Sequence, residues 1–371
     1  MRIAHISDTH LGYRQYNLNV REQDIYDAFN QAIDIALEER ADVLIHSGDL
    51  FDTPQPPIKA LYTLKDALGR IGDKMKVLCV LGEHDTPKRR GMAPHRLFDI
   101  FGINVLGANY HLEDIVIDDV LFAGISNIRG QASDHLKAEL KKFDPMAEKY
   151  ESAVLILHQA LETYLPFEGA FQLKDDELPQ NAIYYAMGHI HAREMESFGR
   201  GKLAYSGSTE IMNKDEITSW QEKGKGLNLI DIDKGEVEVE QIDLDLRPQK
   251  KLTIEVENLE ERLKELSFEK KPILHLEIIG KLIDKKSVYE TLKDHLEENV
   301  VSYRPVFTNT EVKKLQIPKG KIDFAEILRQ YYEEEDKAEF ALELFETLSI
   351  GEVEGAIESA HKRLEGGDFS K

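Results

Sequence analysis

The chain has 371 residues, of which 42% are hydrophobic and 31% charged, with a formal net charge of −22 and one cysteine. This length suffices for two or three domains, and the acidic balance excludes a protein coated with basic nucleic-acid-binding patches. A single cysteine excludes an internal disulfide, and no run of about eighteen apolar residues is present to cross a membrane.

The compartment follows from the same features. Cys79 lies in the apolar run KVLCVLG and reads as a buried strand residue in a reducing compartment. The N-terminal MRIAHISDTH lacks the regions of a signal peptide. We therefore expect a cytoplasmic protein. Much of the acid excess lies late in the chain, in runs such as YYEEEDKAEF, so the N-terminal part is freer to meet a polyanion.

The first ninety residues alternate between strand and helix patterns. RIAHIS, residues 41–49 and residues 76–82 are short apolar runs typical of buried strands. Residues 22–40 and 57–71 carry apolar residues at helical spacing. This alternation predicts stacked α/β layers.

The rest of the chain changes character twice. From about 115 to 245 the pattern favours strands, interrupted by one helix around 133–142. We expect a large first domain over 1–245 and a small α/β domain over 246–308, with the order strand, helix, strand, helix, strand. Residues 309–320 are expected to be a linker, and residues 321–371 an acidic helical segment.

Polar residues recur where the predicted strands end. The motifs are SDTH, SGD, GEHD, LILHQ and GHIH, and they supply Asp8, His10, Asp49, Glu83, His84, His158, His189 and His191. Side chains at i and i+2 of a strand point to one side, so strand ends can converge on one point. Mixed imidazole and carboxylate ligands suit Mn²⁺, Fe²⁺ or Zn²⁺. The ligands exceed what one ion needs, so the simplest interpretation is two ions bridged by Asp49, a site type that serves phosphoester displacement.

The remaining histidines show no such pattern. His5 and His46 sit in apolar strands and are expected to be core residues with satisfied hydrogen bonds. Six others are interpreted as structural or surface residues: His95, His111, His135, His275, His295 and His361.

The order Asp-x-His, Gly-Asp, Gly-Asn-His-[Asp/Glu], His and Gly-His-x-His is the signature of calcineurin-like metallophosphoesterases, which this sequence resembles through DTH, GDLFD, GEHD, LHQ and GHIH. HISDTHLGYRQYN, YYAMGHIHAR, YSGSTE and KGLNLID are similar to one branch, the meiotic recombination eleven nuclease of double-strand-break repair, called SbcD in bacteria. The resemblance implies two facing mixed β-sheets flanked by helices, a DNA-capping domain over 246–308 and C-terminal helices that dock an ABC-type, SMC-like ATPase.

The resemblance also implies roles for the motif residues. Asp8, His10 and His191 would hold one Mn²⁺, His158 and His189 the other, and Asp49 would bridge them. His84 would stabilise charge on the scissile phosphate or protonate the leaving 3′-oxygen. The implied activity is Mn²⁺-dependent cleavage of DNA, as a 3′→5′ exonuclease on duplex ends and an endonuclease on single strands, with hairpins as further substrates.

Two positions depart from the family pattern. Some relatives carry a histidine three residues after the bridging aspartate, where this chain has Asp52. Glu83 stands where the second ion normally meets an asparagine. With Asp8, Asp49 and Glu83 ionised, three negative charges would face two divalent ions, which leaves a positive centre for a phosphodiester.

Candidate DNA contacts and interfaces follow the motifs. For phosphate or base contact the candidates are Tyr13, Arg14, Tyr16, Lys88, Arg89, Arg90 and Arg193, each weighed against a plain surface role. The resemblance also implies a homodimer built from two helices of each protomer, for which the candidates are Leu61, Leu64, Leu68, Met92, Leu97, Phe98 and Phe101. The alternative to a dimer interface is that these helices only cover a sheet of their own chain.

We expect a DNA-repair nuclease that is associated with the nucleoid, and we consider two alternative functions. One is a phosphatase or cyclic-nucleotide phosphodiesterase, which GYRQYN, the capping domain and the helical tail disfavour. The other is a scaffold without activity, which is disfavoured because the four ligand histidines and His84 are all present.

Overall fold

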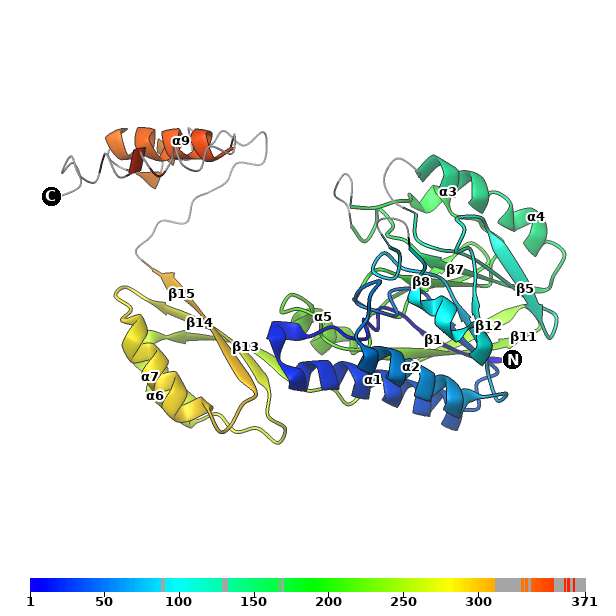
Figure 1. The fold of residues 1–371 in the computed structure, drawn as a ribbon, viewed down its shortest axis with the longest axis horizontal. Helices are drawn as coiled ribbons and strands as arrows, with labels where there is room; N and C mark the ends of the chain where they lie inside the picture. The colour runs from blue at the N-terminus through cyan, green and yellow to red at the C-terminus, as the bar shows by residue number, and fades with distance from the viewer. Residues whose placement is uncertain are drawn as a thin grey trace. The chain divides into compact units, whose positions relative to one another are not determined.

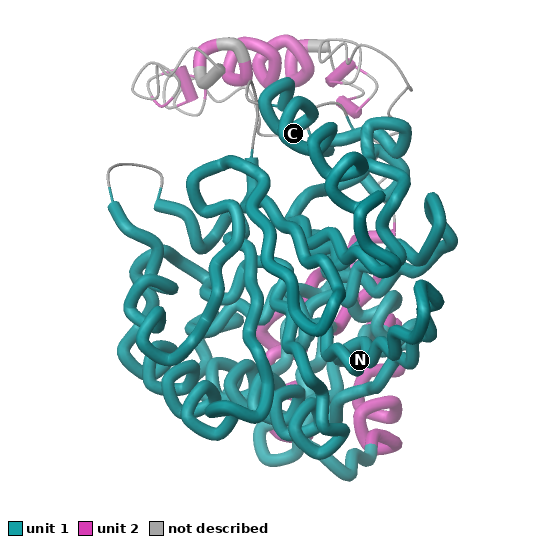
Figure 2. Tube along the Cα trace, turned by 90° about the vertical axis from the view of Figure 1, so that its right-hand side faces the viewer, with its two compact units in different colours: residues 1–252, 267–275, 297–304 teal, residues 253–266, 276–296, 305–371 magenta. Residues whose placement is uncertain are grey.

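The computed structural model describes residues 1–87, 91–128, 133–165, 167, 170–310, 328–329, 331–332, 335–349, 357, 359–360 and 363. The chain divides into two compact units (Figure 2). Unit 1 comprises residues 1–252, 267–275 and 297–304, and unit 2 comprises residues 253–266, 276–296 and 305–371. This division cuts through the segment 246–308 that the sequence suggested as one domain.

The first sheet of unit 1 has the strand order β12-β11-β1-β2-β3-β4. Its strands are β1 Arg2–Ile6, β2 Val43–His46, β3 Lys76–Cys79, β4 Ile103–Val105, β11 Gly226–Asp233 and β12 Glu236–Asp243. β1 to β4 run parallel, and β11 and β12 are antiparallel. Parallel neighbours need crossover connections, and α1 Asn19–Glu38 and α2 Ile58–Ile71 supply two of them.

The second sheet of unit 1 has the order β5-β6-β7-β8-β10-β9. Its strands are β5 Glu113–Ile117, β6 Val120–Ile125, β7 Ser152–His158, β8 Tyr184–Gly188, β9 Glu194–Phe198 and β10 Gly201–Tyr205. The four central strands are parallel, and β5 and β9 close the edges in antiparallel pairing. The predicted fold class, two mixed sheets with helices, is confirmed.

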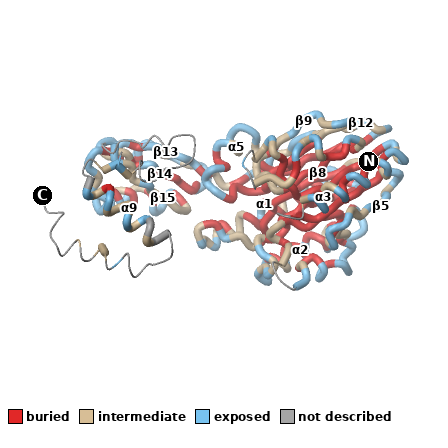
Figure 3. The backbone as a smooth tube through the Cα atoms, turned by 90° about the horizontal axis from the view of Figure 1, so that it is seen from above, coloured by how far each residue is buried: buried red, intermediate tan, exposed pale blue. Residues whose placement is uncertain are grey.

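Three apolar clusters bind these layers together. In β7, Val154 and Ile156 point into the cluster between the two sheets, whereas Leu155 and Leu157 join the cluster on the other face. Such alternation is the period of a strand buried on both faces. α1 and α2 cover the outer face of the first sheet, and α3 Ser133–Leu140 and α4 Phe143–Ala147 cover the second (Figure 1). Buried residues accordingly concentrate along the strands (Figure 3).

The alternation expected for residues 246–308 is present. A three-stranded sheet has the order β13-β14-β15, with β13 Gln249–Glu255, β14 Ile273–Gly280 and β15 Ser302–Asn309. Between these strands lie η5 Val256–Asn258, α6 Leu259–Lys264 and α7 Lys285–Leu296. Of the C-terminal segment, α9 Glu335–Ser349 is described as helix, and the expected linker residues 311–320 lie outside the described residues.

Part of the sequence interpretation is wrong. Between 115 and 245 we expected one helix, but α4 and α5 Glu216–Lys223 are also helical. α4 is too short, at 5 residues, for an apolar period to show, and in α5 the buried residues are only Glu216 and Ile217, so no apolar stripe repeats along it. The short helical turns η1 Gln15–Asn17, η2 Pro94–Phe101 and η4 Asp175–Glu177 complete the unit.

Candidate metal centre

The motif residues lie where parallel strands of both sheets end. Asp8 and His10 follow β1, Asp49 follows β2, and His84 follows β3. In the second sheet, His158 ends β7, and His189 and His191 follow β8. Because the carboxyl ends of parallel strands lie at one edge, the fold gathers these side chains in unit 1.

Two glycines allow the strand ends to approach this closely. Gly48 precedes Asp49 with φ +98°, and a Cβ there would overlap the His158 ring. A Cβ on Gly82 would overlap Asp49. Space therefore requires glycine in both the SGD and the GEHD motif, and at Gly48 the backbone conformation requires it as well.

Asp8, His10 and His191 form the first group, with one ligand atom of each within 4.8 Å of the others. The Nε2 atoms of His10 and His191 face each other at 3.2 Å. Nδ1 of His191 donates to Glu216 Oε1 at 2.9 Å, and Nδ1 of His10 lies 3.6 Å from Asp52 Oδ1. The Glu216 carboxylate draws the ring proton of His191 to Nδ1, so its Nε2 carries the lone pair that a metal ligand needs.

Asp8, Asp49 and His158 form the second group within the same 4.8 Å limit. Nδ1 of His158 donates to the Ser47 carbonyl at 2.8 Å, while its buried Nε2 has no hydrogen-bond partner and lies 3.4 Å from Asp49 Oδ2. An orphaned buried nitrogen aimed at a buried carboxylate fits a ligand position. Asp49 also belongs to a group with His10 and His84, so its carboxylate lies between the two sets of ligands.

The electrostatics of the centre fit a cation. Burial disfavours the ionised form of Asp49, but His158, His10 and His84 outweigh it and hold the pKa of Asp49 below its ordinary value. Burial likewise opposes the protonated form of His10, but Asp52, Asp49 and Asp8 raise the pKa of this ring. The imidazole and carboxylate donors match the borderline divalent ions.

Two predicted ligands lie beside these groups and not within them. The backbone N–H of His189 donates to Asp8 Oδ2 at 3.1 Å, and its ring centroid lies 5.3 Å from that of His158. Burial and His158 lower the pKa of His189, and Glu83 acts in the opposite direction. Glu83 Oε1 lies 3.5 Å from His84 Nε2.

His84 stands at the open side of the centre, with 41% of its side chain exposed. Its Nδ1 donates to the Asp52 carbonyl at 2.8 Å, and its ring meets that of His10 edge to face at 4.9 Å. The bond to Glu83 outweighs burial and raises the pKa of His84 to about 9. His84 therefore carries its proton in this arrangement and holds it near the ligand groups.

Sequence reasoning missed the residues that hold the ligands in place. Glu216 accepts from His191, and its Oε2 pairs with the buried Lys225 Nζ at 2.8 Å. Lys225 Nζ also donates to the His191 carbonyl at 2.9 Å. Asp85, the last residue of GEHD, accepts from the backbone N–H of Gly82 and Phe51, both at 2.9 Å, and so ties two strand ends together. Only the aspartate within the motif left a signal in the sequence.

Comparisons with known proteins match this arrangement. A family model described as calcineurin-like phosphoesterase matches residues 1–193. A protein of Thermoplasma acidophilum named "DNA double-strand break repair protein Mre11" is 35% identical over 363 residues, 95% of each chain. This chain belongs to the Mre11 family of calcineurin-like phosphoesterases. The resemblance inferred from the motifs is confirmed, and the chain is an enzyme of the metal-dependent phosphodiesterase class.

Further Mre11 proteins are similar over most of their length. That of Sulfolobus acidocaldarius is 38% identical over 317 residues, 82% of this chain and 81% of its own. That of Methanocaldococcus jannaschii is 34% identical over 348 residues, 88% of this chain and 90% of its own. Among solved structures, a dimetal phosphatase of Danio rerio is 11% identical with a TM-score of 0.41, covering 62% of this chain and 92% of that one. No helix in the described part of the chain has the length and apolar character that a bilayer crossing requires.

The residues that the sequence suggested for DNA contact lie in different surroundings. Arg14 is exposed, whereas Tyr13 donates its hydroxyl to the Met212 carbonyl at 3.1 Å. The guanidinium of Arg304 lies over the Tyr16 ring, 4.1 Å from its centroid. Lys88, Arg89 and Arg90 lie outside the described residues.

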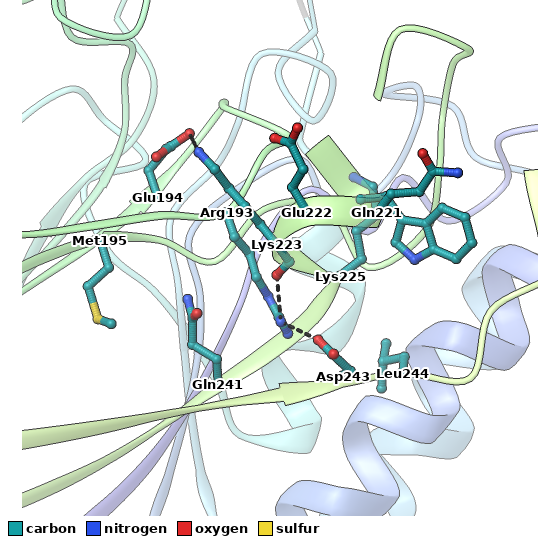
Figure 4. Close-up of a pocket in the computed structure, with 12 residues that line it drawn as sticks. Arg193, Glu194, Met195, Gln221, Glu222, Lys223, Lys225, Gln241, Asp243 and Leu244 are labelled. Atoms are coloured by element: carbon teal, nitrogen blue, oxygen red, sulfur yellow. Dashed lines mark hydrogen bonds and ion pairs between the residues drawn. The ribbon is translucent and has the colours of Figure 1, made fainter. Parts of the chain in front are cut away.

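Arg193 does not suit a DNA contact. Its residue exposure is 3%, and its guanidinium pairs with Asp243 and donates to the Ile242 carbonyl. Figure 4 shows the side chain running into the wall of a pocket of about 940 Å³, toward Asp243 and the Lys223 carbonyl. An arginine already paired and desolvated in this way has no face left for a phosphate.

Three of the residues suggested for a dimer serve the core of their own unit. Leu64 and Leu68 are 3% exposed, and Phe98 is 4% exposed, all within the cluster beneath the first sheet. Leu61 is half-buried against the same cluster. Met92, Leu97 and Phe101 are exposed, by 70%, 61% and 36%. The helical period of α2 thus identified a face that packs on the sheet, whereas of the candidates in the second segment only Phe98 packs there.

Proposed function

We propose that this chain is a Mn²⁺-dependent nuclease that processes DNA ends in double-strand-break repair, acting as a 3′→5′ exonuclease on duplex ends and as an endonuclease on single strands and hairpins. The observation that carries the proposal is the pair of ligand groups sharing Asp8 at the strand ends, in a member of the Mre11 family. A two-ion centre of this kind serves in-line phosphodiester displacement.

Asp8, His10 and His191 would hold one Mn²⁺ ion, and Asp49 would be shared with the second. His158 would hold that second ion, together with His189 and Glu83, which lie beside the ligand groups. When bound, the two ions lower the pKa of water and neutralise charge on the phosphate.

His84 acts as the proton donor to the scissile phosphodiester. Its Nδ1–H is anchored on the Asp52 carbonyl, so Nε2 is the nitrogen that faces the centre. A protonated Nε2 stabilises negative charge on the scissile phosphate or gives its proton to the leaving 3′-oxygen. The Asp52 side chain lies beside the His10 ring, so at the position where some relatives have a histidine this chain has a carboxylate that faces His10, while only its backbone carbonyl anchors His84.

The wider assembly belongs to the same proposal. Arg14 and the segment 88–90 steer the DNA, residues 246–308 cap it, and a second copy of the chain joins through the exposed side of α2 and η2. The C-terminal helices, with α9, dock an ABC-type SMC-like ATPase through an apolar face in a groove of the partner. Such a complex works in the cytoplasm, at the nucleoid.

The proposal is tested with labelled hairpin and duplex DNA in Mn²⁺, using the wild type and His84→Ser. We expect the variant to keep both ions, measured by plasma mass spectrometry, and to lose cleavage by at least about 100-fold. His295→Ser, far from the centre in sequence and bonded to the Thr291 carbonyl, is the control and should cleave normally. Fast hydrolysis of a nitrophenyl phosphate ester without DNA cleavage would instead establish the phosphatase alternative, and absence of bound metal would favour a scaffold.

A further inference from the structure

A second kind of histidine cluster lies apart from the phosphoesterase centre. His111, His135 and Glu139 each place one ligand atom within 4.8 Å of the others. His135 and Glu139 are four residues apart on α3 and therefore share one face of the helix. His111 comes from the segment before β5, more than twenty positions earlier in the chain. Neither histidine belongs to a ligand motif along the chain.

The ligand atoms are already oriented by the backbone. Nε2 of His135 lies 2.7 Å from the Tyr110 carbonyl, which can only accept, so this nitrogen carries the proton and Nδ1 the lone pair. Oε2 of Glu139 accepts from the Leu112 N–H at 2.9 Å, which turns Oε1 toward the histidines. Metal-binding histidines are commonly fixed through their other nitrogen in this way. Both anchors flank His111 in one short segment.

The spacing also suits an ion. Nδ1 of His111 lies 3.2 Å from Glu139 Oε1. Two ligands of a tetrahedral ion with bonds of about 2.0–2.1 Å are separated by about 3.3 Å. The Glu139 side chain is 6% exposed while that of His111 is 59% exposed, so a buried carboxylate stands behind an open entry path.

We propose that His111, His135 and Glu139 bind a divalent transition-metal ion of the Zn²⁺ class that links residues 110–112 to α3. Two imidazoles and one carboxylate are donors that Zn²⁺, Co²⁺ and Ni²⁺ accept, with water completing the coordination. This site is distinct from the two groups of the nuclease centre and does not depend on the proposed DNA activity.

One side chain competes with the ion. Lys142 Nζ contacts Glu139 Oε1 at 2.6 Å, and the Lys142 side chain is 56% exposed. The exposed Lys142 ammonium can move into solvent when an ion takes its place, because the ion then supplies the positive charge that the buried Glu139 carboxylate needs. Removal of the ammonium group should therefore strengthen ion binding, whereas a plain surface ion-pair cluster would gain nothing from it.

The test measures Zn²⁺ retained by the full chain after equilibrium dialysis, by plasma mass spectrometry. We expect His135→Ala and His111→Gln each to hold one equivalent less than the wild type, while His295→Ala holds the wild-type amount. Lys142→Ala should keep that equivalent and bind it several-fold more tightly. Zn²⁺ should also raise the melting temperature of the wild type above that of His135→Ala by about 2–4 °C.

The outcomes separate this site from the nuclease centre. Mn²⁺-dependent DNA cleavage should be unchanged in His135→Ala, whose circular dichroism reports folding. Equal Zn²⁺ content in wild type, His135→Ala and His111→Gln would overturn the proposal and leave the nuclease proposal intact. Unaltered affinity in Lys142→Ala would also count against it, because Lys142 is the group that holds Glu139 in the metal-free protein.

Discussion

Residues of the metal centre hold unusual backbone conformations. Asp8, His10, Asp49 and His189 have φ values of 50°, 44°, 53° and 92°. The left-handed region costs a non-glycine residue about 1–2 kcal/mol, so such residues persist only where the surroundings over-determine them. Four of them in one centre indicate a geometry kept for ligand placement and maintained by the packed sheets.

Glu83 is the residue whose charge departs most from the family pattern. We expect Glu83→Asn to weaken Mn²⁺ binding by roughly tenfold or more while cleavage at saturating Mn²⁺ is preserved or raised, because a neutral ligand leaves the ion a stronger Lewis acid. Calorimetric titration and single-turnover cleavage measure the two effects. Unchanged Mn²⁺ affinity would show that Glu83 is not a ligand.

Glu216 orients His191 without being a motif residue. In Glu216→Gln the charged acceptor for His191 Nδ1 is lost, and the buried Lys225 loses its partner. We expect Mn²⁺ affinity to fall about 10–100-fold, with some loss of stability. Glu222→Gln, exposed on the same helix, is the matched control and should bind normally. An affinity equal to the wild type would contradict the orienting role.

His5 links stability to pH. It is fully buried between the Tyr184 hydroxyl at 2.9 Å and the Ser47 hydroxyl at 2.8 Å, and burial lowers its pKa to about 3. Below a pH of about 6.5, His5 binds a proton in the unfolded chain but stays neutral in the folded chain. The free energy of unfolding therefore falls by about 1.4 kcal/mol for each pH unit below that value, until the pH reaches the pKa of His5 in the folded chain.

His5 should change how steeply the free energy of unfolding depends on pH. Between pH 7 and pH 5 the free energy of unfolding of metal-free His5→Gln should fall by about 2 kcal/mol less than that of the wild type. Denaturant titrations at both pH values measure this difference, which is insensitive to a constant packing cost in the variant. Equal slopes would show that His5 is not the group responsible.

At the scale of elements, α2 and η2 each present two different faces. The inner face of α2 includes Leu64, whereas Ile58 is 85% and Tyr62 is 62% exposed. In η2, Phe98 is buried and Ile100 is 86% exposed. The helical period of apolar residues identifies the face that packs on the sheet. A partner protein can contact only the exposed apolar residues outside that face.

The proposed dimer is tested on those outer residues. The double change Ile58→Glu and Ile100→Glu should convert a dimer into a monomer in light scattering, because charge at an apolar contact cannot be desolvated cheaply. Leu64→Ala should leave the dimer intact and lower the free energy of unfolding by about 2–5 kcal/mol. Dissociation by Leu64→Ala alone, or a wild-type monomer, would contradict this assignment of faces.

At the scale of the whole molecule, the centre depends on two sheets that share one core. The first sheet supplies Asp8, His10 and Asp49, and the second supplies His158 and His191. Phe122, with no exposed surface, belongs to the cluster between the sheets. Packing of that cluster therefore sets the distance between ligands that no local sequence connects.

Phe122→Ala should reduce the free energy of unfolding by about 3–5 kcal/mol and also weaken Mn²⁺ binding, because the cavity lets the sheets shift. Leu292→Ala, at a fully buried position of α7 in unit 2, is the control. It should cost about 2–5 kcal/mol but leave Mn²⁺ affinity unchanged. Equal effects of the two changes on metal binding would contradict the dependence on the shared core.

The sequence by itself determined the order of the main strands and helices and the metal motifs, and the fold of two facing sheets came from the family resemblance that those motifs carry. This information is local: apolar period marks a buried strand or helix face, and a polar pair after a strand marks an end where ligands gather. The family followed from the same motifs, because their order along the chain is specific.

Only the tertiary structure decided the rest. Glu216 reaches His191 across 25 positions, and Arg193 meets Asp243 across 50 positions, so one becomes an orienting residue and the other a buried ion pair. His111 and Glu139 likewise meet only because α3 packs beside the segment before β5. Contacts of this kind depend on which faces the folded layers bring together, and no local pattern along the chain records them.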